Sequence, residues 1–127
     1  GMLAMEPEVL VLDEVTAMLD PVGRRDVLET VTRLNKEKNI TVIMITQSME
    51  EATMADRVAV MAGGCLQAVG APREIFSRAA YLRSLGLDVP AMVKLRDDLM
   101  IEGLLTDCEA ITVEEMRVSP SACLAFR

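Results

Sequence analysis

The amino-acid sequence predicts an α/β fold: parallel central strands with flanking helices, then a short β-hairpin and a mostly helical C-terminal extension. Two runs of aliphatic residues, 9–12 and 40–46, are the first observation, and the first run ends in two acids. Between the runs, apolar residues recur at the spacing of a helix. A strand, a helix and a second strand in this order predict a parallel pair joined by a crossover helix.

The first strand and the first helix have clear boundaries in the sequence. The four aliphatic residues from Val9 to Leu12 are typical of a strand buried on both faces, because they do not alternate with polar residues. Asp20 followed by Pro21 indicates a helix start, with a carboxylate at the N-cap and proline at the first helical position. This helix is expected to end at Asn39, directly before the second strand.

Capping and turn residues predict the later elements. Ser48 to Glu51 matches a capping box and starts a helix that runs to about Ala55. Two strands, residues 57–61 and 66–69, are joined across Gly63-Gly64 and predict a hairpin. Beyond it, the sequence predicts a helix at 72–85, a helix at 90–102, a capping box at 112–115 and a turn at 119–122.

Composition excludes several classes of protein. The chain has 127 residues, enough for one domain, and with 51% hydrophobic and 26% charged residues it is unlike disordered protein. A formal net charge of −7 gives no general attraction to phosphate backbones, so no nucleic-acid partner is expected. The absence of histidine excludes Ser-His-Asp and Cys-His nucleophilic sites and every His-ligated metal site. Any chemistry must therefore use carboxylates, amides or backbone groups.

Cysteine spacing and hydropathy predict a cytoplasmic protein. The three cysteines, Cys65, Cys108 and Cys123, form no C-x-x-C pair, which fits a reducing compartment and argues against a disulfide framework or a zinc site. No window holds the ~18 consecutive apolar residues of a membrane-spanning helix. No basic-then-apolar leader opens the chain.

Asp13 and Glu14 are the first candidate functional residues. A buried strand that ends in these acids places them at the carboxyl edge of the sheet, where open α/β folds bind ligands. Adjacent strand residues point to opposite sides, so one acid can hold a cation while the other faces a nucleophile. Taken alone, the pattern also fits a structural strand that runs into an acidic loop.

Four segments of the chain, in order, resemble the ATP-binding subunits of ABC transporters. VLVLDEVTAMLDP, from Val9 to Pro21, resembles the Walker B strand that ends in L-D-E-P-T and its following A-x-L-D-P loop. ITVIMITQSMEE, residues 40–51, is similar to the family's strand and switch loop. Residues 56–61 and 70–76 are similar to the segments D-R-V-x-V-M and G-T-P-R-E-V-F. The tail most resembles the energy-coupling-factor subgroup, which serves vitamin and transition-metal uptake.

The resemblance covers about residues 3–78 and implies a fold and a division of the chain. It implies a partial P-loop NTPase domain of the ABC ATPase type. Residues 1–78 would be the C-terminal half of the nucleotide-binding domain, with Walker B, the loop after it and the switch loop. Residues 79–127 would be the helical extension of the subgroup.

The resemblance also assigns roles to individual residues. Asp13 would be the Walker B acid that holds Mg²⁺ largely through water, and Glu14 would be the general base or water-orienting carboxylate for attack on the γ-phosphate. Gln47 stands at the switch position. The loop that communicates with a second ATPase subunit would include Thr16, Ala17, Leu19 and Asp20. ATP and Mg²⁺ are the ligands expected of the complete subunit.

Two residues depart from the family pattern at this site. Gln47 replaces the switch histidine; its amide can donate to a γ-phosphate oxygen and accept from a water, but it cannot become a cation. Slower hydrolysis is therefore expected in an assembled enzyme. Val15 replaces the family's proline, which restores a backbone N–H and frees φ, and is expected to loosen the link between Glu14 and the following loop.

The sequence lacks the G-x-x-x-x-G-K-[ST] phosphate loop, the L-S-G-G-Q signature and the family's loop glutamine. Residues 1–7 resemble the end of the helix that follows the signature, so the chain is expected to start within the domain. Without the phosphate loop, the acids would face a polyphosphate with little to neutralise it, and the chain alone is expected neither to bind nor to hydrolyse ATP.

Two interpretations of the chain stay open at this stage. In the first, it is part of an ATP-hydrolysing importer subunit that pairs with a second ATPase subunit and a transmembrane coupling subunit, at the inner face of the cell membrane. In the second, it is a non-catalytic half that acts only as a protein-interaction module. In either case, central strands without full cover expose apolar surface, so the chain is expected to self-associate.

Overall fold

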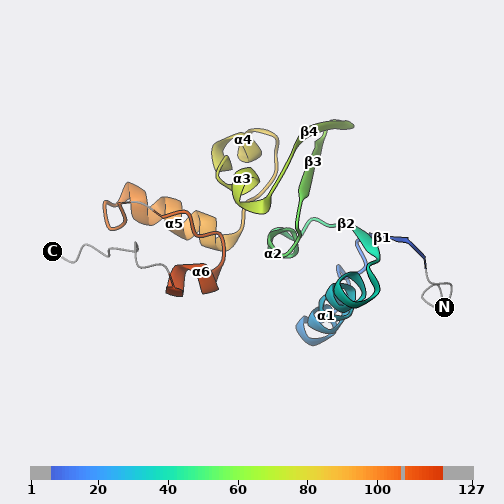
Figure 1. The fold of residues 1–127 in the computed structure, drawn as a ribbon. Coiled ribbons are helices and arrows are strands. Elements are labelled where there is room, and N and C mark those ends of the chain that lie inside the picture. The colour runs from blue at the N-terminus through green and yellow to red at the C-terminus, as the bar shows by residue number, and fades with distance from the viewer. Residues whose placement is uncertain (1–6, 107, 119–127) are drawn as a thin grey trace. The chain divides into compact units, whose positions relative to one another are not determined.

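The computed structural model describes residues 7–106 and 108–118 (Figure 1). These residues fall into two compact units, and the division lies after Ser48. The expectations for residues 1–6 and for the turn at 119–122 lie outside the described residues. None of the described helices is both long and apolar enough to cross a bilayer.

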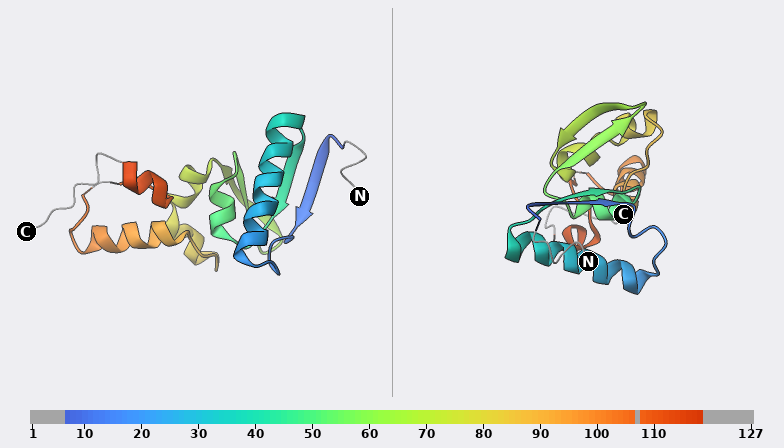
Figure 2. Two further views of the ribbon diagram at one scale, coloured as in Figure 1. Left: turned by 90° about the horizontal axis from the view of Figure 1, so that it is seen from below. Right: turned by 90° about the vertical axis from the view of Figure 1, so that its right-hand side faces the viewer.

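The first unit is the strand, helix and strand that the sequence predicts. Strand β1 (Val9–Asp13) pairs in parallel with β2 (Thr41–Ile45), in a register that places Val9 opposite Thr41 and Asp13 opposite Ile45. Helix α1 (Pro21–Lys38) connects them and lies along one face of the pair (Figure 2). The parallel pairing brings the carboxyl ends of both strands to one edge.

Local chemistry sets the two ends of α1. The Asp20 side chain accepts a hydrogen bond from the Gly23 amide at 3.1 Å, which satisfies one of the free N–H groups of the first turn. A side chain at Gly23 would place its Cβ 2.9 Å from that Asp20 oxygen, so glycine allows the close approach. The helix ends at Asn39, whose φ of 58° is the left-handed conformation that asparagine tolerates.

The two faces of the β1–β2 pair differ in burial. Leu10 is buried and Leu12, Val42 and Met44 are half-buried, on the face that α1 covers. On the opposite face, which we call the outer sheet face, the exposed residues are Val9, Val11, Ile43 and Ile45, each about half accessible. The run of aliphatic residues is typical of a strand buried on both faces, but α1 covers one side only, and the outer sheet face is the uncovered apolar surface that the sequence predicts for this chain.

The second unit opens with helix α2 (Met49–Thr53) and the predicted hairpin. Strands β3 (Val58–Ala62) and β4 (Cys65–Gly70) are antiparallel, and Gly63 and Gly64 form the turn with φ of 57° and 74°. Both values are easily reached by glycine, which is why two consecutive glycines make a tight hairpin turn.

The predicted helix at 72–85 is two helices, α3 (Pro72–Phe76) and α4 (Ala79–Ser84). The Ser77 hydroxyl donates to the Glu74 carbonyl at 2.8 Å, and Arg78 leaves helical geometry at ψ 45°. A serine hydroxyl that bonds back to the preceding turn favours a bend in a helix. The hydrophobic core of the unit lies around this break, formed by Val60, Ile75, Phe76, Ala79, Leu82, Val89, Val93 and Ile111.

Helices α5 (Ala91–Ile101) and α6 (Val113–Val118) complete the second unit. Asp88 lies before α5 and accepts hydrogen bonds from the ammonium of Lys94, in α5, and from the Val89 amide. These bonds hold the pKa of the Asp88 carboxyl below its ordinary value. Arg73 of α3 pairs with Glu115 of α6 at 2.7 Å and donates to the Glu109 carbonyl, which joins the C-terminal segment to α3. The predicted capping residue Thr112 accepts from the Glu115 amide at 3.3 Å.

The core explains where the chain divides into compact units. The hairpin packs through Val60 and Val58 against α3 and α4, so residues 49–78 belong to the same unit as the C-terminal helices. The structural division therefore falls after Ser48, whereas the division at 78/79 follows the family resemblance and stays a prediction.

Candidate functional site

The candidate site lies at the carboxyl edge of β1 and β2, within the first unit. Asp13 is the last residue of β1 and is exposed, and its backbone is aligned with Ile45 at the end of β2. The Glu14 amide donates to the Ile45 carbonyl at 2.9 Å, which extends the pairing of the strands by one bond. The structure thus places Asp13 and Glu14 where the sequence predicts them, at the carboxyl edge of the sheet.

Glu14 has a backbone conformation that is rare outside glycine. Its φ is 45°, in the left-handed region, where a β-carbon crowds the following carbonyl. The Glu14 carbonyl accepts from the Ala17 amide at 3.1 Å, which closes a turn directly after the strand. Since backbone bonds hold both its amide and its carbonyl, the surrounding structure maintains this conformation, as is common at functional sites.

Gln47 follows β2 and contacts the Glu14 carboxylate. Its Nε2 donates to Glu14 Oε1 at 2.7 Å, across 33 positions of sequence. The distance is short for an amide donor and typical of a bond to a charged acceptor. Both side chains are exposed, so water can also reach the pair.

The turn after β2 fixes the backbone around Gln47. Thr46 Oγ1 accepts a hydrogen bond from the Ser48 amide at 2.9 Å, closing a local turn with Gln47 at its centre. The sequence reasoning missed the role of Thr46. The signal in the sequence is the position of Thr46, two residues before Ser48, where the predicted capping box begins.

The remaining predicted site residues form the loop from β1 to α1. Thr16 is buried at 3% exposure, and its carbonyl accepts from the Leu19 amide at 3.1 Å. Ala17 and Leu19 are exposed, and Asp20 caps α1 through its side chain. The structure therefore shows the N-cap role of Asp20, while the contact of this loop with a second subunit stays a prediction.

The donors at the site fit a magnesium ion better than a metal that needs a full protein cage. Among the described residues, no group of three or more acidic, cysteine or histidine side chains is arranged to hold a metal. Asp13 offers a hard oxygen ligand at the strand end, and the carboxylate of Glu14 follows it directly. Magnesium suits such a site, because it retains several waters and binds through one or two carboxylates plus substrate phosphates.

Relatives of the chain are found among named ATP-binding proteins, although no family model matches it. The energy-coupling factor transporter ATP-binding protein EcfA1 of Clostridioides difficile is 52% identical over 116 residues, which are 91% of this chain and 42% of that protein. The protein of the same name from Caldanaerobacter subterraneus is 50% identical over 116 residues, which are again 91% of this chain and 42% of that protein. The chain thus spans less than half the length of these relatives.

A solved structure shows the same relationship. It is CbiO1 from Clostridium perfringens, described as part of the ABC transporter complex CbiONQ, with a TM-score of 0.56 and 35% identity. The match covers 75% of this chain and 38% of CbiO1. The resemblance drawn from the motifs is confirmed: the chain is a relative of the energy-coupling factor ATP-binding proteins, and where it matches CbiO1 it has the fold of an ABC ATPase.

Proposed function

We propose that the chain supplies the metal-binding and water-activating side chains of an ATP-hydrolysing subunit in an importer of the energy-coupling-factor type. The observation that carries the proposal is the hydrogen bond from Gln47 to Glu14 at the strand edge, next to Asp13. It joins two of the three side chains to which the motifs assign chemistry, and the third, that of Asp13, belongs to the residue directly before Glu14. A strand that merely ran into an acidic loop would not require a polar partner for Glu14 from the turn after the neighbouring strand.

Each acid has a separate role in the proposed reaction. Asp13 would hold Mg²⁺, largely through water, and the ion would offset the negative charge on the phosphates of ATP. Glu14 accepts a proton from the attacking water as the water oxygen bonds to the γ-phosphorus and the bond to the β–γ bridging oxygen breaks. Gln47 already donates to one oxygen of Glu14, which leaves Oε2 to receive this proton.

The partners of the proposed subunit follow from the relatives. The C. perfringens relative is described as part of an ABC transporter complex. By analogy, this chain would work beside a second ATPase subunit and a transmembrane coupling subunit, held at the inner face of the membrane. The loop at Thr16, Ala17, Leu19 and Asp20 would contact the second subunit. The 127-residue chain alone, without a phosphate loop, is expected to show no binding of Mg-ATP in isothermal titration.

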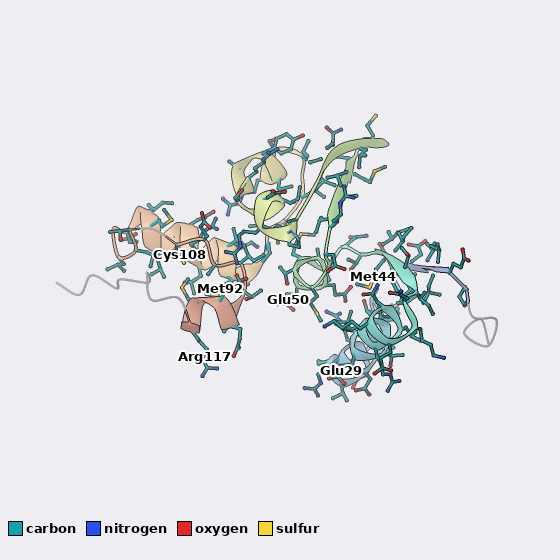
Figure 3. All side chains as sticks on the ribbon, in the orientation of Figure 1. Glu29, Met44, Glu50, Met92, Cys108 and Arg117 are labelled. Carbon is teal, nitrogen blue, oxygen red and sulfur yellow. The ribbon has the colours of Figure 1, made fainter. Side chains whose placement is uncertain are left out.

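Steady-state hydrolysis of ATP by the subunit that contains this chain tests the proposal. Glu14→Gln removes the proton acceptor and is expected to lower kcat by about 100- to 10,000-fold. The matched control is Glu29→Gln, the same change at an exposed position of α1 (Figure 3), which should leave kcat unchanged. Full turnover in the Glu14→Gln variant would exclude the proposed function and favour an interaction module.

A further inference from the structure

Arg73 of α3 makes contacts that the proposed reaction does not use. It lies in the segment 70–76, whose sequence is similar to a family motif. Its Nη1 donates to the Glu109 carbonyl at 2.8 Å, and its Nη2 pairs with Glu115 Oε1 at 2.7 Å. One guanidinium therefore holds the C-terminal part of the chain at two separate points.

We infer that residues 108–118, which we call the strap, are fastened to α3 by Arg73, and that release of the strap uncovers the Cys108 thiol. The strap belongs to the second unit, so this inference does not rest on the proposed hydrolysis. A guanidinium suits the role, because its planar fork of donors can bind a carbonyl and a carboxylate at the same time. Arg73 and Glu115 have side chains that are 48% and 36% exposed, so water competes for their contact and the fastening can open.

Bonds within the strap extend the hold of Arg73 to Ile111. The second oxygen of Glu115, Oε2, accepts from the Ile111 amide at 2.9 Å, and the Thr112 hydroxyl accepts from the Glu115 amide at 3.3 Å. Ile111 is 5% exposed and belongs to the hydrophobic core of the second unit. Arg73 thus holds the carboxylate that holds the Ile111 backbone, and Ile111 is the apolar anchor of the strap.

Cys108 (Figure 3) reports whether the strap is in place. Its side chain is 8% exposed, and its Sγ donates to Met116 Sδ at 3.7 Å. A second, smaller hydrophobic cluster joins the strap to the end of α5 and consists of Leu99, Leu105, Cys108, Ala110 and Met116. When the strap leaves α3, this cluster separates and the thiol becomes accessible. Because thiol reagents need access to the sulfur, the labelling rate measures the open fraction.

The rate at which Cys108 is labelled in the full chain tests the inference. Cys65→Ser and Cys123→Ser leave Cys108 as the single cysteine, and an aromatic disulfide reagent measures its reaction. Arg73→Met keeps the apolar part of the side chain but removes all its donors. It is expected to raise the labelling rate about 10-fold, because an ion pair and a hydrogen bond to a carbonyl are lost.

Lys94→Met is the matched control. It removes the cation of another exposed ion pair of the second unit, the pair with Asp88 at 2.8 Å. That pair makes no contact with the strap, so it is present in both the fastened and the released state. The labelling rate of Cys108 should therefore stay unchanged. An unchanged rate in Arg73→Met, or an equal rise in Lys94→Met, would overturn the inference.

Hydrogen exchange distinguishes release of the strap from unfolding of the whole unit. In the unmodified chain, the open fraction measured at the Ile111 amide should equal that measured at the Cys108 thiol. Both should exceed, by at least about 10-fold, the open fraction at the Leu82 amide, which donates to the Arg78 carbonyl in α4. Equal open fractions at all three positions would overturn the inference, because the thiol would then be exposed only when the second unit unfolds.

Discussion

Glu14 combines an unusual backbone with a side chain held by a distant residue. The sequence predicts that the acid follows a strand, because aliphatic runs and their polar ends are local features. It does not predict the φ of 45°, which depends on the bonds of Glu14 to Ile45 and Ala17. Nor does it predict the contact with Gln47, since that contact requires the parallel register of β1 and β2.

At position 47 the chain has glutamine where the family pattern has histidine, so the side chain there cannot carry a positive charge. Gln47→His provides a ring N–H that can still donate to Glu14 and a side chain that can carry a positive charge. Charge-assisted bonds are stronger, so this change is expected to raise kcat by about 5-fold, or about 1 kcal/mol in the barrier. The measurement is steady-state ATP hydrolysis by the subunit containing this chain. A fall in kcat would contradict the account of this position.

Regular elements of the chain are mostly those that its sequence predicts. Local chemistry determines several of these features, because each depends on one or two adjacent residues. They are the strand ends, the N-cap at Asp20, the end of α1 at Asn39 and the turn at Gly63-Gly64. The break between α3 and α4 was not predicted, because helical periodicity continues through Ser77 and Arg78. At the break, the Ser77 hydroxyl bonds back to the Glu74 carbonyl, and Phe76 and Ala79 on either side belong to the hydrophobic core.

The cap of α1 gives a prediction at this scale. Asp20→Ala removes the acceptor for the Gly23 amide and should lower the free energy of unfolding by about 1 kcal/mol. Urea denaturation of the chain measures the change, and hydrogen exchange of the Gly23 amide should become faster. Asp26→Ala, at an exposed position within α1, is the control and should change the stability much less. Equal losses in the two variants would exclude a specific capping role.

At the scale of the whole molecule, the chain has an apolar sheet face that no described residue of its first unit covers. The outer sheet face exposes Val9, Val11, Ile43 and Ile45 at 50–55%. The sequence predicts the hydrophobic runs but not which face is covered, because continuous aliphatic strands carry no alternation. The predicted parallel strands are confirmed, and so is the expectation that they lack full cover in this chain.

This face should drive association of the chain with itself. An exposed apolar face of a β-sheet favours contact with the same face of a second copy. Light scattering over a concentration series is expected to show oligomers, and Val11→Thr with Ile43→Thr should shift them toward monomer. Val22→Thr removes an equally exposed valine from α1 and serves as the control. A monomer with a sharp melting transition for the unmodified chain would contradict this expectation.

The nucleotide bound to the Glu14→Gln variant tests the central claim most directly. If Glu14 activates water and does not bind ATP, the variant of the subunit that contains this chain still binds Mg-ATP, and the nucleotide recovered from it is ATP. The unmodified subunit, treated in the same way, yields ADP. Recovery of ADP from the variant at the rate of the unmodified subunit would contradict the role assigned to Glu14.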